Sequence, residues 1–134
     1  MLPRRALRLG AALCATAALV LPAAAGQATP RAAGPGAPGI GDDYYPGYGN
    51  GGYDVSHYDI RLKYSPSTDQ LQGSTTLLAR PTQDLTSFNL DFALNASSVR
   101  VNGAKAAFSR TGTELTVTPA RTLKAGQLTT VVVE

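Results

Sequence analysis

The sequence predicts an all-β domain, an antiparallel sheet of the sandwich type, that follows an export signal and a flexible linker. Three observations predict this class. Beyond residue 41, short apolar segments alternate with period two, as half-buried strands do. Gly, Pro, Asn and Asp separate about seven such segments at regular spacing. No segment after the leader has the apolar period of a helix. The apolar face of the sheet must therefore be covered by other strands of the same chain.

Residues 1–25 resemble a secretory signal peptide. Its basic start is formed by Arg4, Arg5 and Arg8. Residues 9–21 follow as an apolar run that is too short for a comfortable membrane-spanning helix. Small residues then offer a cleavage site after Ala25, with Ala28 as the alternative. We therefore expect the rest of the chain to be secreted into an extracellular compartment.

The charge balance excludes several partners. The chain has 12 Lys and Arg against 9 Asp and Glu, but three of the basic residues lie in the signal. The exported part is formally neutral, so neither a nucleic acid nor an anionic membrane is expected as a partner. The one cysteine, Cys14, leaves with the signal, and the exported part then has no disulfide. Its stability must come from an apolar core.

The remaining chain divides into two parts. Residues 26–41 are rich in Ala, Gly and Pro and predict a flexible linker. Residues 42–134 predict one small β-domain. Its final apolar segment, residues 128–133, has no turn residue after it, so we expect a strand with an unpaired edge in an incomplete domain.

The first hairpin is predicted from residues 55–64 and 71–79. The turn at residues 65–69 contains Pro, Ser and Asp, which favour tight turns. Gly73 is a candidate bulge in the returning strand. Along the first strand, an apolar face that should pack on the core contains Tyr58, Ile60, Leu62 and Tyr64. The opposite, polar face contains His57, Asp59, Arg61 and Lys63.

The later strands are shorter. Residues 85–94 place Phe88, Leu90 and Phe92 on one face. The dipeptide Asn102-Gly103 is a strong hairpin signal and should join residues 99–101 to residues 106–109. Another strand is expected around Leu115 and Val117, before Pro119.

No catalytic or metal-binding residue is predicted in this chain. A catalytic zinc needs several His or Glu ligands and a base, and His57 is the only histidine. We therefore assign His57 to the polar face of a strand. Asp42, Asp43 and Asp54 lack the ligand spacing of a calcium loop. The other aspartates are scattered, with nothing that pairs two of them as acid and base: Asp59, Asp69, Asp84 and Asp91.

Two features of the entry segment have a functional and a structural interpretation. Residues 49–52, Gly-Asn-Gly-Gly, suggest a phosphate cradle, but no helix follows, so a turn with positive φ is favoured. All six tyrosines lie between Tyr44 and Tyr64. They suggest a stacking platform for ligands, but we favour packing of Tyr58 and Tyr64 in the sheet, with the others anchoring the entry.

Residues 42–134 resemble the N-terminal β-domain of secreted bacterial zinc aminopeptidases of the aminopeptidase N (gluzincin) family. The entry segment, GNGGYDVSHYD, is the most specific part of this resemblance. The similar segments are residues 45–46, 49–59, 84–92, 99–103 and 114–119.

The resemblance implies a saddle-shaped β-domain that covers a thermolysin-like catalytic domain and walls its cleft. In the family, zinc is held by an H-E-x-x-H helix and a distant Glu, and a G-x-M-E-N segment binds the substrate amine. None of these motifs occurs in this chain, so zinc, the peptide substrate and the downstream catalytic domain are expected only for a longer parent. The alternative is a self-contained secreted β-sandwich that binds a ligand through its Tyr-rich entry segment.

Overall fold

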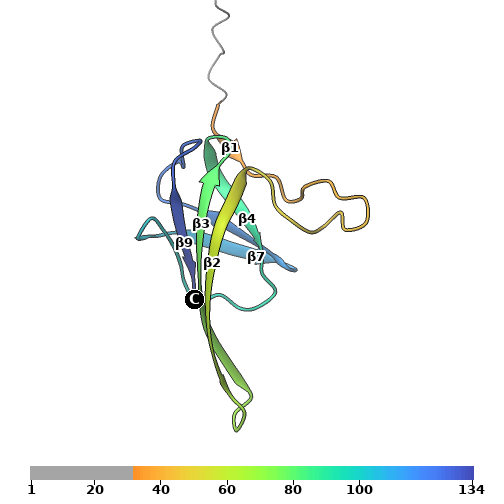
Figure 1. Ribbon diagram of the computed structural model, residues 1–134, viewed down its shortest axis with the longest axis vertical. Coiled ribbons are helices and arrows are strands. Elements are labelled where there is room, and N and C mark those ends of the chain that lie inside the picture. The colour runs from red at the N-terminus through yellow and green to blue at the C-terminus, as the bar shows by residue number, and fades with distance from the viewer. Residues whose placement is uncertain (1–31) are drawn as a thin grey trace, which may run out of the picture.

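The computed structural model describes residues 32–134, which form nine β-strands in two sheets (Figure 1). No helix occurs within this range, so the predicted all-β class is confirmed. The two sheets pack face to face without closing into a barrel, which is a sandwich-like arrangement. Within the same residues, no helix is long and apolar enough to cross a membrane. The predicted signal, residues 1–25, lies outside the described residues.

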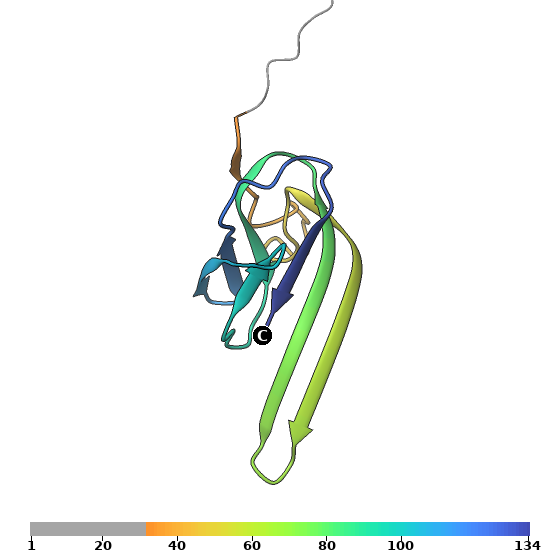
Figure 2. The same cartoon turned by 90° about the vertical axis from the view of Figure 1, so that its left-hand side faces the viewer.

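The larger sheet has five strands in the order β2-β3-β9-β5-β6, all antiparallel to their neighbours. The strands are β2 (Tyr53–Ser65), β3 (Gln70–Pro81), β9 (Thr129–Val133), β5 (Val99–Val101) and β6 (Ala104–Lys105). β2 and β3 are much longer than the others. Their hairpin therefore extends well beyond the rest of the molecule (Figure 2).

The smaller sheet has four strands in the order β1-β4-β8-β7. The strands are β1 (Gly34–Pro35), β4 (Leu85–Asp91), β8 (Glu114–Thr118) and β7 (Ala107–Thr111). β1 pairs with β4 in parallel, and the other pairs are antiparallel. Alternating burial at Phe88 and Leu90 of β4 and at Leu115 and Val117 of β8 shows that one face of this sheet points at the larger sheet.

The core lies between the two sheets. Its fully buried side chains are Leu85, Val99, Leu115 and Val117. Phe88 and Leu90 of β4 join them, as the period-two pattern of residues 85–94 predicts, and Phe92 packs against the cluster half-buried. Burial of such side chains stabilises the fold by about 1.5–3 kcal/mol each relative to exposure.

The position of β9 corrects one expectation. Residues 128–133 were expected to form an unpaired edge, but β9 lies in the middle of the larger sheet. It pairs with β3 from Ala79 to Thr75 and with β5 from Val101 to Val99. Both of its neighbours precede it in the chain, so no following residues are needed to complete its pairing. The sequence of one strand does not reveal which earlier strands leave a gap for it.

The stretch expected to be a flexible linker is ordered over part of its length. Within residues 26–41, the amides of Gly34 and Gly36 donate to the carbonyls of Asp84 and Ser87 at 3.1 and 2.9 Å. Gly36 is buried, and a side chain there would meet the Gly51 carbonyl at 2.7 Å. A glycine- and alanine-rich segment can therefore add a short edge strand because it lacks bulk.

The predicted hairpin turn at Asn102-Gly103 is confirmed, but the bulge predicted at Gly73 lies elsewhere in the first hairpin. Asn102 and Gly103 both have positive φ, 50° and 79°, as a two-residue hairpin of the predicted kind requires. The returning strand divides in two: β6 closes this hairpin, and β7 then joins the other sheet. The bulge of the first hairpin lies at Ser56, between Val55 and His57, and Gly73 is in regular register with Leu62.

Candidate functional site

The most unusual surface of the domain is an apolar stripe on the projecting hairpin. We define the apolar stripe as Tyr58, Ile60, Leu62, Tyr64 and Leu71. These side chains share one face, because the register pairs Tyr58 with Leu77 and Tyr64 with Leu71. They are 48–64% exposed. The predicted alternation is therefore correct, but the expected burial of this face is wrong within the described residues.

The bulge at Ser56 places the apolar stripe on the same face of the sheet as the core residues. One extra residue reverses the facing of every side chain that follows it. Val55, opposite the buried Ala79, and Tyr58, opposite the buried Leu77, therefore point to the same side. The stripe is thus the continuation of the core face of the sheet, beyond the area that the smaller sheet covers (Figure 2).

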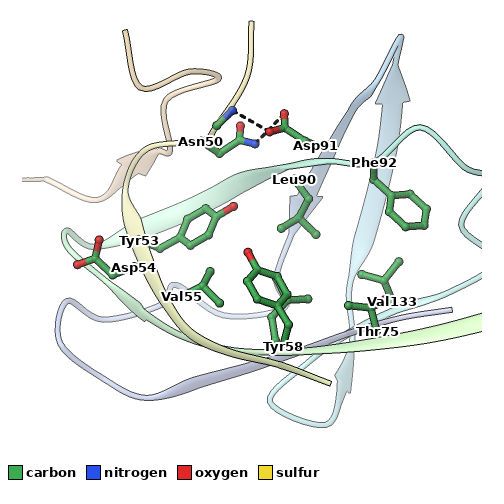
Figure 3. A pocket seen from close by; sticks show the side chains of 12 residues that line it. Asn50, Tyr53, Asp54, Val55, Tyr58, Thr75, Leu90, Asp91, Phe92 and Val133 are labelled. Carbon is green, nitrogen blue, oxygen red and sulfur yellow. Dashed lines mark hydrogen bonds between the residues drawn. The ribbon is translucent and has the colours of Figure 1, made fainter. Parts of the chain in front are cut away.

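A cavity of about 430 Å³ opens where the covered face becomes the stripe (Figure 3). Tyr58 stands beside it, and Leu77, Leu90 and Val133 line it with apolar surface. Asp91 and Asn50 lie at the opposite side of the opening from Tyr58 (Figure 3). Tyr58 belongs to both the cavity and the stripe, so the two form one continuous, largely apolar surface that can receive an apolar partner.

The opposite face of the hairpin is polar and does not form a zinc site. His57 is exposed there, as predicted. Asp59 accepts hydrogen bonds from Arg61, at 2.8 Å from Nη2, and this bond lowers the pKa of the Asp59 carboxyl. The described residues contain no group of three His, Cys, Asp or Glu that could hold a metal. The donor set of residues 32–134 does not fit a catalytic zinc.

The tyrosines do not have the expected roles. Tyr53 is the one that packs in the core: its ring meets that of Phe88 edge-on at 5.7 Å, and its hydroxyl donates to the Asn89 carbonyl at 2.6 Å. Burial, with smaller contributions from Tyr58 and nearby carboxylates, raises the pKa of its phenol. Tyr58 and Tyr64, expected in the sheet interior, are instead members of the exposed stripe.

The entry loop, defined as residues 36–52, projects from the body of the domain (Figure 1). Tyr44, Tyr45 and Tyr48 are 63–89% exposed on it, and the rings of Tyr45 and Tyr48 meet edge-on at 5.9 Å. They do not anchor the loop against the sheets. Oδ1 of Asp42 accepts hydrogen bonds from the backbone amides of Tyr44 and Tyr45 at 2.8 and 2.9 Å. This is a local turn.

The glycine-rich end of the entry loop is a backbone turn, as predicted. Gly49 and Gly52 have φ of 74° and 100°, which side chains rarely adopt. At Gly52, a Cβ would also lie 3.1 Å from Leu85 and 3.2 Å from Gly36. Strand β2 follows directly, so no helix N-terminus is there to receive a phosphate.

Sequence reasoning missed one pair of acids. Asp91 was grouped with the scattered aspartates, but β4 and β8 place it directly opposite Glu114. Both Glu114 oxygens are buried without a hydrogen-bond partner. Burial, followed by the neighbouring Asp91, raises the pKa of Glu114. The pairing of residues 85–94 with the segment around Leu115 would have revealed this contact, but strand register is not visible in either segment alone.

Neither protein-family models nor curated protein sequences match this chain. Solved structures do match it. The M1 zinc metallopeptidase of Deinococcus radiodurans is 29% identical with a TM-score of 0.63. The match covers 71% of this chain and 22% of that one. A point mutant of the same organism's enzyme, bound to a Tyr-Ser-Ala substrate, matches with the same identity and TM-score over 23% of its length.

A structure described as a two-domain M1 zinc metallopeptidase, bound to L-arginine, matches equally well, with 29% identity and a TM-score of 0.63. The chain spans about a fifth of the length of the peptidases it matches. All three share the fold of the described domain and more than a quarter of its aligned residues. The resemblance to the M1 zinc metallopeptidases, the aminopeptidase N family, is thereby confirmed for this chain.

Proposed function

We propose that this chain forms a non-catalytic β-domain of an exported zinc aminopeptidase. In this proposal the domain serves as a scaffold and wall of the active-site cleft, and a catalytic domain of the same polypeptide removes N-terminal residues from peptides. The single observation that carries the proposal is the similarity to M1 zinc metallopeptidases over 71% of the chain. One of these is described as having two domains, and another as bound to a tripeptide substrate.

The apolar stripe supports a partner domain. Soluble proteins rarely leave a large contiguous apolar patch in water, and such patches usually mark interaction surfaces. The stripe lies on a two-stranded hairpin whose other face is charged, so one face is suited to water and the other to protein. The concave cavity beside it would admit a protruding apolar side chain of the partner.

Zinc and the catalytic groups belong, in this proposal, to the partner domain. The described residues offer one exposed histidine and no cluster of metal ligands. The zinc of the parent would supply Lewis-acid chemistry to a substrate carbonyl. This chain's contribution is positional: a rigid sheet that holds one side of the substrate cleft. The proposed export is supported by residues 1–25, whose basic start and apolar run are typical of a signal peptide.

A second function is favoured by the exposed tyrosines of the entry loop. Tyr45 and Tyr48, with Ile40, form a shallow aromatic surface that suits a small ligand or a peptide. A self-contained secreted binding module would use this surface and would need no catalytic domain. The two proposals differ in which surface acts: the apolar stripe in the first, and the entry loop in the second.

The coding DNA beyond the Glu134 codon distinguishes the two. The peptidase proposal expects the reading frame to continue for several hundred codons and to contain G-x-M-E-N followed by H-E-x-x-H. The encoded product should hydrolyse an amino-acid nitroanilide and lose this activity with a zinc chelator. A stop codon directly after Glu134 would contradict the peptidase proposal for this product and favour the binding module.

A further inference from the structure

The acidic pair Asp91 and Glu114 lies where the entry loop meets the smaller sheet. Asp91 is the last residue of β4 and Glu114 the first residue of β8, and the antiparallel register places them directly opposite each other. Side chains in such a position have Cβ atoms about 4.5–5.5 Å apart, and like charges there repel. Two ionised carboxylates are therefore an unfavourable arrangement at this point of the sheet.

The hydrogen bonds around the pair are unequal. Asp91 accepts the Gly49 amide on Oδ2 at 2.7 Å and the Asn50 side-chain amide on Oδ1 at 3.3 Å (Figure 3). Both Glu114 oxygens and Asn50 Oδ1 are buried with no donor. A buried carboxylate without a donor is costly, whereas a protonated carboxyl supplies its own O–H. The Asp91 carboxylate is the acceptor for such an O–H, whereas the side-chain amide of Asn50 acts in the opposite sense and lowers the pKa of Glu114.

No cation of the neighbouring elements faces the pair. β4 contributes Asp91 itself, and β2 contributes the phenol of Tyr53, which donates to a backbone carbonyl. β7 contributes the neutral Thr111 opposite Glu114. The guanidinium of Arg110, also on β7, is engaged by the Ala93 and Gly112 carbonyls and by Asn95. The entry loop contributes only the neutral Asn50 amide.

We infer that Asp91 and Glu114 hold one proton between them, and that this shared proton keeps Gly49 and Asn50 of the entry loop attached to the smaller sheet. The two ends of the loop are held separately, because the Gly36 amide donates to the Ser87 carbonyl and the Thr82 amide to the Gly52 carbonyl. When the Glu114 carboxyl releases its proton to water, two anions remain opposite each other. Their repulsion moves Asp91 away from Gly49 and Asn50. The far part of the loop, residues 39–48, otherwise makes hydrogen bonds only within itself. The pair is therefore a pH-sensitive contact that positions the exposed Tyr44, Tyr45 and Tyr48 of the entry loop.

The direction of the switch follows from the raised pKa of Glu114, whose ordinary value is 4.5. A group with a raised pKa in the folded state stabilises that state fully below its ordinary pKa. This contribution is lost as the pH rises through the raised value. The loop is therefore attached in acid and loosened towards neutral pH. The inference does not depend on the proposed peptidase function, because it concerns only residues of this chain.

The test is an NMR titration of the full 134-residue chain, isotopically labelled, between pH 4 and pH 8. The Glu114 carboxyl carbon reports protonation, and the amide exchange of Gly49, corrected for the intrinsic effect of pH, reports loop attachment. We expect Glu114 to titrate above its ordinary range and the protection of Gly49 to fall about tenfold with it, the size of one charge-assisted hydrogen bond.

Two variants and a control make the result specific. Glu114→Gln keeps the shape, is always neutral and can donate to Asp91, so Gly49 should remain protected across the whole range. Asp91→Asn removes the repulsion and should also abolish the pH dependence, even if Glu114→Gln folds poorly. Asp43→Asn, an exposed acid of the entry loop, should behave as the unchanged chain. Titration of Glu114 at or below its ordinary pKa, or a pH dependence that persists in both pair variants, would overturn the inference.

Discussion

Strands β2 and β3 keep the same alternation of apolar and polar residues from their base, which the smaller sheet covers, to their tip, which lies in solvent. At their base, Val55, Leu77 and Ala79 face the smaller sheet and are buried or half-buried. Towards the tip, Ile60 and Leu62 have the same facing but lie in solvent. The comparison shows that period two decides which side chains share a face, whereas the length of the opposing sheet decides whether that face is covered. Changes at the two ends should therefore have very different effects.

The largest difference is expected for the same substitution at a core and a stripe leucine. Leu115 is 1% exposed and Leu62 is 64% exposed. Leu115→Ala should lower the free energy of unfolding by about 2–5 kcal/mol, because it removes apolar contacts and leaves a cavity. Leu62→Ala should change it by about 0.5 kcal/mol or less. Urea unfolding of the full chain measures both, and equal losses would contradict the difference between the two environments.

Two glycines sharpen the comparison at the backbone. Gly52→Ala, at φ of 100° and against Leu85, should lower the free energy of unfolding by about 1–3 kcal/mol. At Gly73 a Cβ would approach Leu62 Cδ2 at 2.7 Å, but this side chain is exposed and free to turn aside. Gly73→Ala should therefore change stability by less than about 1 kcal/mol. A larger loss at Gly73 than at Gly52 in thermal unfolding would show that the hairpin is packed in solution.

A hydroxyl provides a third contrast. Tyr53→Phe removes the hydrogen bond to the Asn89 carbonyl and should lower the free energy of unfolding by about 1 kcal/mol. Tyr58→Phe is the control, because Tyr58 lies on the exposed stripe. Its effect should fall within measurement error of about 0.5 kcal/mol. Chemical unfolding at neutral pH compares the two, and an equal effect of both substitutions would refute the assignment of Tyr53 as the core tyrosine.

The smallest effect is expected at two ion pairs. Lys124 contacts Asp84 at 2.7 Å, and this bond, with a further one from the Ala125 amide, lowers the pKa of the Asp84 carboxyl. Its stabilisation is present above the ordinary pKa of 3.8 and is lost as the pH falls through the lowered value. Lys124→Met should lower Tm by about 1–2 °C at pH 6 and less at pH 2. Arg61→Met on the hairpin should lower Tm by less than Lys124→Met at pH 6, because both partners of that ion pair are more exposed to solvent; calorimetry can check this order.

Much of this fold follows from local sequence. The alternation in residues 55–64 and 85–94 predicts the facing of the long strands, and Asn102-Gly103 predicts its hairpin, because both signals act over a few residues. The central position of β9 was not predicted, because its partners Thr75–Ala79 and Val99–Val101 are distant in sequence. The ordered Gly34–Pro35 was missed for the same reason: its partner strand, not its composition, makes it a strand.

The candidate surfaces were predictable to different degrees. The stripe residues were identified as one face, but the extent of the smaller sheet is a tertiary property, so their exposure was not foreseen. The pairing of Asp91 with Glu114 requires the register of β4 on β8, and 22 residues separate the two acids in the sequence. Sequence patterns thus predicted which apolar and polar side chains each strand presents. The packing and register of the two sheets determine which of these side chains contact one another.

The central claim, that the apolar stripe packs against a partner domain, is tested most directly by hydroxyl-radical footprinting read by mass spectrometry. The 134-residue chain would be compared with the longer product that the peptidase proposal expects. We predict that Tyr58 and Tyr64 react readily in the 134-residue chain and become protected in the longer product, while Tyr44 reacts equally in both. Equal reactivity of Tyr58 and Tyr64 in the two proteins would contradict the claim and leave the stripe without a partner in that polypeptide.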